Sequence, residues 1–174
     1  MYTPDFARNH FELLGLPVAF AVDPARLESR YRELQGRVHP DRFAAGSEAE
    51  RRVAMQWATR ANEAYRTLRD PLARARYLLQ LRGFDTGEES NTAMPPDFLM
   101  QQMEWREAAA EATRAHDTEA LAKLAADLER ERRDMLERLA RALDASHYDA
   151  GCSLVRKLRF LEKLEQEIDD ALSP

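Results

Sequence analysis

Val38-His39-Pro40-Asp41-Arg42-Phe43 separates two segments of the chain that both have the periodicity of an amphipathic helix. Upstream, apolar residues recur at spacings of four, three and four on one helix face: Leu27, Tyr31, Leu34 and Val38. Downstream, helical spacing relates Ala54, Ala58, Ala61, Tyr65 and Leu68. The sequence therefore predicts a helical hairpin with this polar stretch at its tip.

Local signals predict where these two helices begin and end. Asp23 is suited to the N-cap and Pro24 to the first helical position, whereas Pro40 disfavours a helical backbone at His39. Residues 47–50, Ser-Glu-Ala-Glu, have the pattern of a capping box. We therefore expect the loop to be held between two well-defined helix ends.

Further helices are expected on both sides of the hairpin. A short one covers residues 9–14, another follows Asp70-Pro71, and three more are expected to form an antiparallel bundle, with a turn at 146–151 before the last. Glycines, prolines and polar residues without periodicity predict a linker between them. The expected fold is all-α, with a first domain over residues 1–82, a linker over 83–96 and a three-helix domain over 97–174.

The composition limits the class of protein. The 174 residues are 44% hydrophobic and 33% charged, as in helical proteins with a real core. No apolar run is long enough to cross a bilayer, and no apolar signal stretch precedes the first helix, so we expect the cytoplasm. Cys152 is the single cysteine, which excludes an internal disulfide and agrees with a reducing compartment.

The net charge of −5 is unevenly distributed, with +4 over residues 1–82 and −9 over residues 83–174. This asymmetry favours two surfaces with different partners, although charged faces are common on helical proteins. The positive charge includes a row of arginines on the helix before the loop. Glu33 interrupts this row and can pair with Arg37, four residues further on. That row consists of Arg26, Arg30 and Arg37, with Arg32 beside it.

One face of the expected helix after residue 97 suits neither a core nor ordinary solvent exposure. Methionine adapts to varied partner shapes, and carboxylates select basic ones. The face consists of Met100, Glu104, Glu107 and Glu111, flanked by Leu99 and Met103. Phe160 lies off the apolar stripe of the last helix, so it is either covered by a neighbouring element or exposed for binding.

Several other functions are disfavoured. His39 and Asp41 are conceivable acid-base partners, but no nucleophile, phosphate-binding glycine loop or metal-ligand set accompanies them, so we expect no enzyme. Cys152 and the other histidines lack metal-ligand spacing, so no metal or cofactor is expected. A nucleic-acid function is disfavoured because the basic half carries little charge and has no aromatic platform.

The His39-Pro40-Asp41 motif between two antiparallel helices resembles the J-domain, by which DnaJ-type co-chaperones stimulate DnaK-class ATPases. Further motifs resemble the HscB family, the J-proteins of iron-sulfur cluster assembly, in its bacterial form without a zinc module. They are Asn62-Glu63-Ala64-Tyr65, Leu68, Asp70-Pro71, Arg74-Ala75, Tyr77-Leu78-Leu79, Gly83-Phe84, Asp97-Phe98-Leu99-Met100 and Val155-Arg156-Lys157-Leu158-Arg159-Phe160-Leu161.

The resemblance implies two binding faces and a co-chaperone rather than an enzyme. Docking on an HscA-like ATPase is implied for His39, Pro40, Asp41, Arg26, Arg30, Arg32, Arg37 and Arg42. Binding of an IscU-like scaffold is implied for Leu99, Met100, Met103, Glu104, Glu107, Glu111 and Phe160. The alternative is a general J-protein whose bundle binds a different client. No exposed heptad seam indicates self-assembly, so we expect a monomer.

Overall fold

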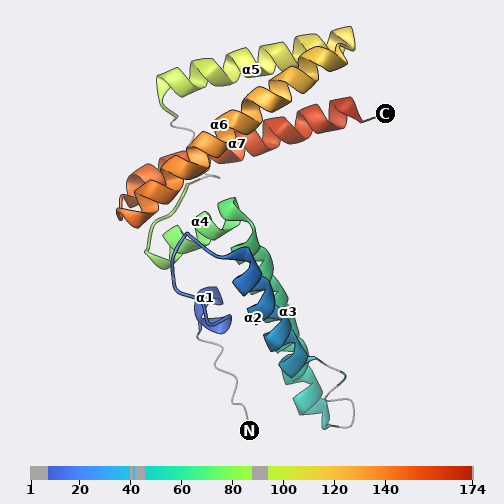
Figure 1. The fold of residues 1–174 in the computed structure, drawn as a ribbon, viewed down its shortest axis with the longest axis vertical. Helices are drawn as coiled ribbons and strands as arrows, with labels where there is room; N and C mark the ends of the chain where they lie inside the picture. The colour runs from blue at the N-terminus through green and yellow to red at the C-terminus, as the bar shows by residue number, and fades with distance from the viewer. Residues whose placement is uncertain (1–7, 40, 42–45, 88–93, 174) are drawn as a thin grey trace. The chain divides into compact units, whose positions relative to one another are not determined.

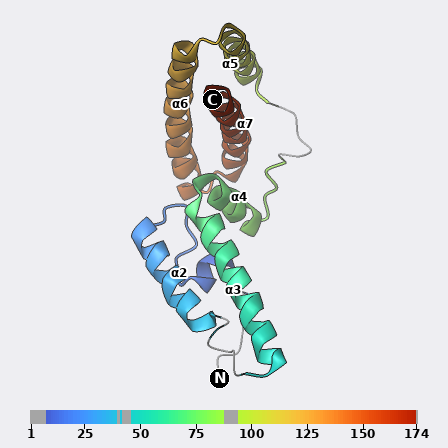
Figure 2. The same cartoon turned by 90° about the vertical axis from the view of Figure 1, so that its right-hand side faces the viewer.

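The structure, a computed structural model, describes residues 8–39, 41, 46–87 and 94–173. This part of the chain is helical and contains no strand, which confirms the all-α prediction (Figures 1 and 2). Contacts between residues divide the chain into two compact units, Met1–Leu78 and Leu79–Pro174. The helices are α1 (His10–Leu13), α2 (Pro24–Val38), α3 (Glu48–Arg69), α4 (Pro71–Leu81), α5 (Pro96–Ala115), α6 (Thr118–Asp144) and α7 (Tyr148–Leu172).

The first unit is built around the predicted hairpin of α2 and α3, against which the short α1 packs (Figure 2). Tyr31 and Tyr65 stack across the hairpin with ring centroids 4.2 Å apart. The hydroxyl of Tyr31 donates a hydrogen bond of 2.7 Å to Asn62 Oδ1. The apolar face predicted from the sequence is largely buried, and its core includes Phe11, Leu27, Leu34, Ala54, Trp57, Ala61, Ala64 and Leu68.

The N-termini of both hairpin helices have the predicted caps. Asp23 Oδ1 accepts a hydrogen bond of 2.9 Å from the backbone N–H of Ala25. Ser47 and Glu50 form the full capping box, because Ser47 Oγ accepts from the Glu50 N–H and Glu50 Oε2 accepts from the Ser47 N–H. These bonds satisfy backbone donors that the first turn of a helix leaves free. The capping box therefore fixes the start of α3 at the tip, and the Asp23 cap fixes the start of α2 at the far end of that helix.

The second unit contains the antiparallel helices α6 and α7, with α5 packed against both (Figures 1 and 2). Its core is mainly leucine: Leu121, Leu128, Met135, Leu139, Val155, Leu158, Leu161, Leu164 and Ile168 are almost completely buried. Arg132 Nε lies 3.3 Å from Glu165 Oε1 and links α6 to α7 at the edge of this core. The arrangement confirms the predicted three-helix bundle.

The turn predicted at residues 146–151 is wrong in its extent. Helix α7 begins at Tyr148, so Gly151 lies within its first turn. A Cβ atom at this position would lie 3.1 Å from a methyl carbon of Leu143 and 3.5 Å from one of Leu79. Glycine is therefore placed here because it permits close packing in the helix, and its general preference for turns misled the sequence interpretation.

Residues directly after α4 pack within the second unit. Arg156 Nη1 donates a hydrogen bond of 2.9 Å to the carbonyl of Thr86, and the rings of Phe84 and Tyr148 lie 5.0 Å apart. Contacts divide the two units between Leu78 and Leu79, inside α4, and the predicted domain limit at residue 82 stays a prediction. The linker expected over 83–96 lies partly outside the described residues and stays a prediction.

We expect Leu128→Ala to lower the free energy of unfolding of the second unit by about 2–5 kcal/mol, because it leaves a cavity at a fully buried site. The two tryptophans, Trp57 and Trp105, lie in different units. In a Trp57→Phe background, urea unfolding followed by Trp105 fluorescence therefore reports on the bundle. The exposed Lys123→Ala variant is the control, and an equal effect of both changes would contradict this core assignment.

Candidate partner-binding faces

The tip of the hairpin exposes the two polar side chains of the motif that the structure describes. His39 follows α2 in an extended conformation, with φ −60° and ψ 128°. Its Nδ1 accepts a hydrogen bond of 3.3 Å from the backbone N–H of Asp41 and lies 3.4 Å from Asp41 Oδ2. A neutral ring in this arrangement carries its proton on Nε2, which is then a donor for a partner. Pro40 and Arg42 lie outside the described residues.

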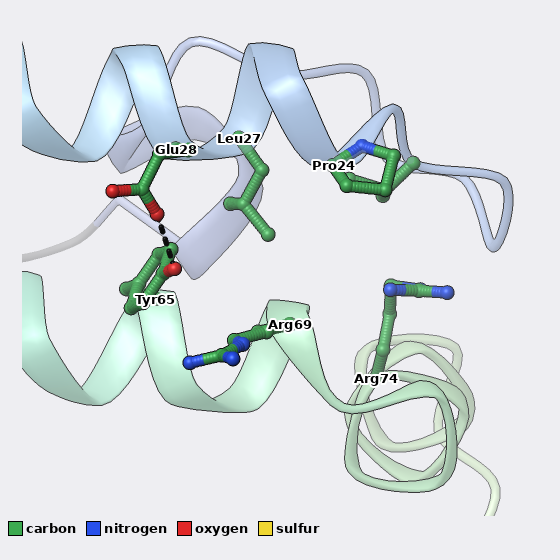
Figure 3. Close-up of a pocket in the computed structure, with 7 residues that line it drawn as sticks. Pro24, Leu27, Glu28, Tyr65, Arg69 and Arg74 are labelled. Carbon is green, nitrogen blue, oxygen red and sulfur yellow. Dashed lines mark hydrogen bonds between the residues drawn. The ribbon is translucent and has the colours of Figure 1, made fainter.

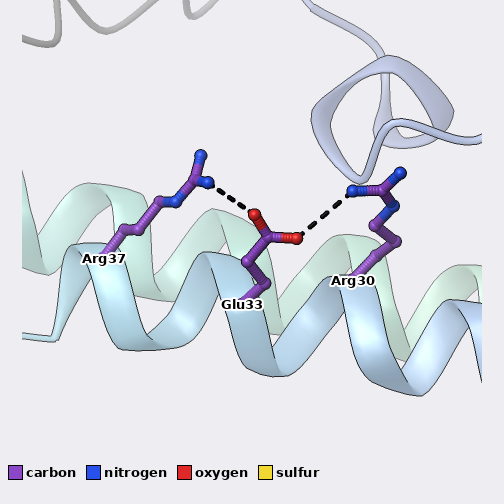
Figure 4. A network of polar contacts seen from close by, with 3 residues as sticks. All are labelled: Arg30, Glu33 and Arg37. Carbon is purple, nitrogen blue, oxygen red and sulfur yellow. Dashed lines mark hydrogen bonds and ion pairs between the residues drawn. The ribbon is translucent and has the colours of Figure 1, made fainter.

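The predicted arginine row is exposed on α2, but most of its charge is paired (Figure 4). Glu33 accepts hydrogen bonds from Arg37 at 2.5 Å and from Arg30 at 3.2 Å. Arg32 pairs in the same way with Glu28 at 2.7 Å. The pair with Arg37 was predicted and the pair with Arg30 was missed, although a spacing of three also brings two side chains together on a helix. Glu33 thus lies between two of the five arginines for which chaperone docking is expected.

For the HscA-like chaperone that the resemblance implies as a partner, we expect Glu33→Gln to speed association about two- to fivefold at low ionic strength, because it removes the negative charge between Arg30 and Arg37. The difference should fall as salt screens the field. Stopped-flow fluorescence measures the rate, and Glu63→Gln on α3 is a control with the same change in net charge. A slower rate for Glu33→Gln would mean that Glu33 aligns the arginines for docking.

A hollow of about 370 Å³ lies between α2, α3 and the start of α4 (Figure 3). Tyr65, Glu28 and Arg74, three of the polar residues that line it, form hydrogen bonds within the unit. The hydroxyl of Tyr65 donates to Glu28 and thereby lowers the pKa of that carboxyl. Arg74 Nη1 donates a bond of 2.5 Å to the carbonyl of Leu68 near the end of α3, and burial lowers the pKa of Arg74. The hollow therefore lies where the end of α3 is joined to the start of α4, and Arg74 satisfies a carbonyl at that end of α3.

Helix α5 exposes the predicted methionine and carboxylate face. The exposed fraction is 42% for Leu99, 64% for Met100 and 71% for Met103. The helix turns Phe98, Ala109 and Ala112 inward against the bundle, which leaves these longer side chains without a covering element. Glu104, Glu107 and Glu111 are also exposed, and within the described chain none of them forms an ion pair. An apolar ridge beside unpaired carboxylates suits an apolar partner surface rimmed by basic groups.

Phe160 is half-buried at the side of this face. Its ring meets the buried Phe98 of α5 edge to face, with centroids 6.0 Å apart and an interplanar angle of 84°. Arg106 of α5 lies over the same ring, with Cζ 5.2 Å from the centroid. The two possibilities left open for Phe160 are both partly realised, because neighbouring side chains cover part of the ring and leave part accessible. The sequence analysis did not single out Arg106.

No group of histidine, cysteine, aspartate and glutamate in residues 8–39, 41, 46–87 and 94–173 is arranged to hold a metal ion. Cys152 is buried, and burial raises the pKa of its thiol. In the same described part of the chain, no helix is long and apolar enough to cross a membrane. The candidate sites are therefore the two exposed faces.

An exposed histidine and aspartate at the tip of a helical hairpin, together with a bundle that bears an unpaired apolar face, define a J-domain-type co-chaperone. The family "HSCB C-terminal oligomerisation domain" matches residues 94–169. The co-chaperone protein HscB homolog of Burkholderia multivorans is 56% identical over 160 residues, covering 92% of this chain and 91% of the relative. The chain belongs to the HscB family of co-chaperones, which act in iron-sulfur cluster biogenesis and are not enzymes.

Solved structures agree with this assignment. HscB of Vibrio cholerae is 41% identical, with a TM-score of 0.82, and the match covers 94% of this chain and 96% of that one. The human co-chaperone HscB is 31% identical, with a TM-score of 0.90, and the match covers 95% of this chain and 83% of that one. Both matches span the two units, so the resemblance is not limited to the bundle.

Proposed function

We propose that this co-chaperone stimulates the ATPase of an HscA-like chaperone of the DnaK class and delivers an IscU-like scaffold to it during iron-sulfur cluster assembly and transfer. The observation that carries the proposal is the exposed ridge of Leu99, Met100 and Met103 beside three carboxylates that pair with no described residue. A general J-protein also needs the hairpin tip. This ridge is what favours a dedicated client with an apolar surface and basic groups.

The two partners are assigned to different units. The proposed chaperone-binding residues are His39, Pro40, Asp41, Arg26, Arg30, Arg32, Arg37 and Arg42, of which the six within the described chain are exposed. The proposed scaffold-binding residues are Leu99, Met100, Met103, Glu104, Glu107, Glu111 and Phe160. Basic charge on α2 suits the acidic surface expected on the chaperone, and acidic charge on α5 suits a basic client.

Single-turnover ATP hydrolysis by an HscA-class chaperone tests the proposal. Four reactions are compared: the chaperone alone, with this protein, with an IscU-type scaffold, and with both. We expect stimulation by this protein and a rate with both partners that exceeds the product of the separate stimulations. Stimulation without this synergy would favour the general J-protein, and absence of stimulation would contradict a chaperone partner.

We also propose a monomer that works in the cytoplasm. The matched family is described as an oligomerisation domain, so a measurement of the oligomeric state tests the proposal of a monomer directly. Sedimentation equilibrium at micromolar concentration should give a mass near 20.0 kDa. If the unchanged protein instead has twice that mass, and changing Leu99 and Met103 to alanine restores the mass of a monomer, the α5 ridge is a dimer interface.

A further inference from the structure

A hollow of the first unit brings an apolar wall and two guanidinium groups together, where α2 begins and α3 joins α4 (Figure 3). Its volume of about 370 Å³ is that of a small-molecule pocket. The apolar wall is formed by three residues around the start of α2 and one aromatic ring of α3: Val22, Pro24, Leu27 and Tyr65. The other lining residues in the described chain are Glu28, Arg69 and Arg74.

The carboxylate of this hollow is already bonded. Glu28 Oε2 accepts a hydrogen bond from the hydroxyl of Tyr65, and Oε1 accepts one of 2.7 Å from Arg32 Nε. Each oxygen therefore has a partner within the unit, and a cationic ligand has to compete with both partners. The hollow is poorly suited to a cation.

The two guanidinium groups have donors to spare. Arg69 is exposed, with Cζ 5.9 Å from the centroid of Tyr65, and it makes no hydrogen bond or ion pair with another described residue. Arg74 makes one hydrogen bond, from Nη1 to the carbonyl of Leu68, and its buried Nε has no partner in the described chain. A guanidinium has several donors and no acceptor, so the hollow has an excess of donors.

The charges around the hollow favour an anion as well. Its lining carries two cations and one carboxylate. Glu28 attracts Arg69, and Asp70 attracts Arg74, but neither carboxylate forms an ion pair with these arginines. Burial lowers the pKa of Arg74, because it disfavours the charged guanidinium, and an anion in the hollow would offset that cost.

We propose that this hollow is a binding site for a small organic carboxylate with an aromatic or short aliphatic body. The body packs against Leu27 and Tyr65, and the carboxylate accepts hydrogen bonds from Arg69 at the rim, within the field of Arg74. Arginine suits this role because its planar donors match the two oxygens of a carboxylate.

The site is separate from the two proposed partner-binding faces. None of its lining residues belongs to the proposed chaperone-binding or scaffold-binding set. It also lies at the end of the hairpin away from His39, since the 15 residues of α2 span about 22 Å. The inference therefore does not depend on the proposed function.

A ligand in this hollow contacts three helices at once. Leu27 belongs to α2, Arg69 to α3 and Arg74 to α4. Because a ligand that binds only the folded state stabilises it, a saturating anion should raise the melting temperature of the first unit. The site then couples the concentration of the anion to the stability of the unit that carries the hairpin tip.

The test is a nuclear magnetic resonance titration of the full-length, isotopically labelled protein with benzoate, at a constant ionic strength of about 150 mM. The backbone amide signals of Leu27, Tyr65 and Arg74 should shift and saturate together, with a dissociation constant of about 5 mM or lower. Benzamide has the ring without the charge, and acetate has the charge without the ring. Each should bind at least about fivefold more weakly than benzoate.

Two variants locate the bound carboxylate. Arg69→Gln should weaken benzoate binding about fivefold or more, because it removes the charged donors at the rim. Arg66→Gln removes the same charge one turn earlier on α3. Arg66 is exposed and does not line the hollow, so its change should alter the affinity by less than about twofold. Both side chains are exposed, and both variants should keep the fold.

Each contrary result overturns the proposal. Equal affinities for benzoate and benzamide would show that the hollow does not recognise charge. Equal affinities for benzoate and acetate would indicate an adventitious ion only. An equal loss in Arg69→Gln and Arg66→Gln would assign the attraction to the general positive field of the unit. If the signals of the lining residues do not shift up to about 50 mM benzoate, the hollow is no binding site.

Discussion

His39→Gln should abolish the stimulation of chaperone ATP hydrolysis while leaving the fold intact. Within the described part of the chain, the hydrogen bond and the ion pair of the His39 side chain are both with Asp41, and half of the side chain is exposed, so we expect its replacement to leave the core packing intact. The amide of glutamine also has an acceptor and a donor, but it lacks the rigid ring that holds the acceptor Nδ1 toward the Asp41 N–H and a donor on the opposite side. We expect single-turnover stimulation to fall about tenfold or more, which corresponds to about 1.4 kcal/mol in the activation barrier.

A matched histidine separates this effect from a general loss of charge or hydrogen bonding. His147 is exposed before α7 and its side chain makes no capping bond, so His147→Gln should retain full stimulation. Both variants should melt within a few degrees of the unchanged protein, since exposed substitutions alter stability by about 0.5 kcal/mol or less. If the His39→Gln variant still stimulated ATP hydrolysis fully, His39 at the hairpin tip would not be needed for stimulation, and this prediction would be contradicted.

The second large effect is expected at the α5 ridge. Changing Leu99 and Met103 to alanine should weaken scaffold binding about 10- to 100-fold, because two apolar side chains lose their burial at the interface. Adding Phe160→Ala should remove the synergy between scaffold and co-chaperone in ATP hydrolysis. Stimulation by the co-chaperone alone should persist, because the hairpin tip is unchanged. Calorimetry and single-turnover hydrolysis measure the two effects.

Met55→Ala is the matched control for the ridge. Met55 is 61% exposed on α3, close to the 71% of Met103, but it belongs to the first unit. Its change should leave scaffold affinity unaltered. Phe160→Ala also removes the contact with Phe98. The double variant with alanine at Leu99 and Met103 keeps Phe160, so it tests the ridge while this contact remains intact. If the double variant binds the scaffold as tightly as the unchanged protein, the client contacts another surface.

Local signals in the sequence determined the helix ends and the hairpin. The Asp23 cap and the Ser47–Glu50 capping box depend on contacts within three residues, which a sequence contains completely. The spacing of apolar residues likewise determined which sides of α2 and α3 are buried. The same reasoning predicted the ridge of α5, because Leu99, Met100 and Met103 lie off the stripe of α5 that packs on the bundle.

Only the tertiary structure decided the contacts between helices. Gly151 was expected in a turn because glycine is common there, and the reason for its place in α7 is the approach of Leu143 from α6. The stacking of Arg106 on Phe160 joins residues 54 positions apart on α5 and α7, which no local pattern predicts. Side-chain packing fixes such distances, since many helix arrangements satisfy one hydrophobic pattern and close packing selects among them.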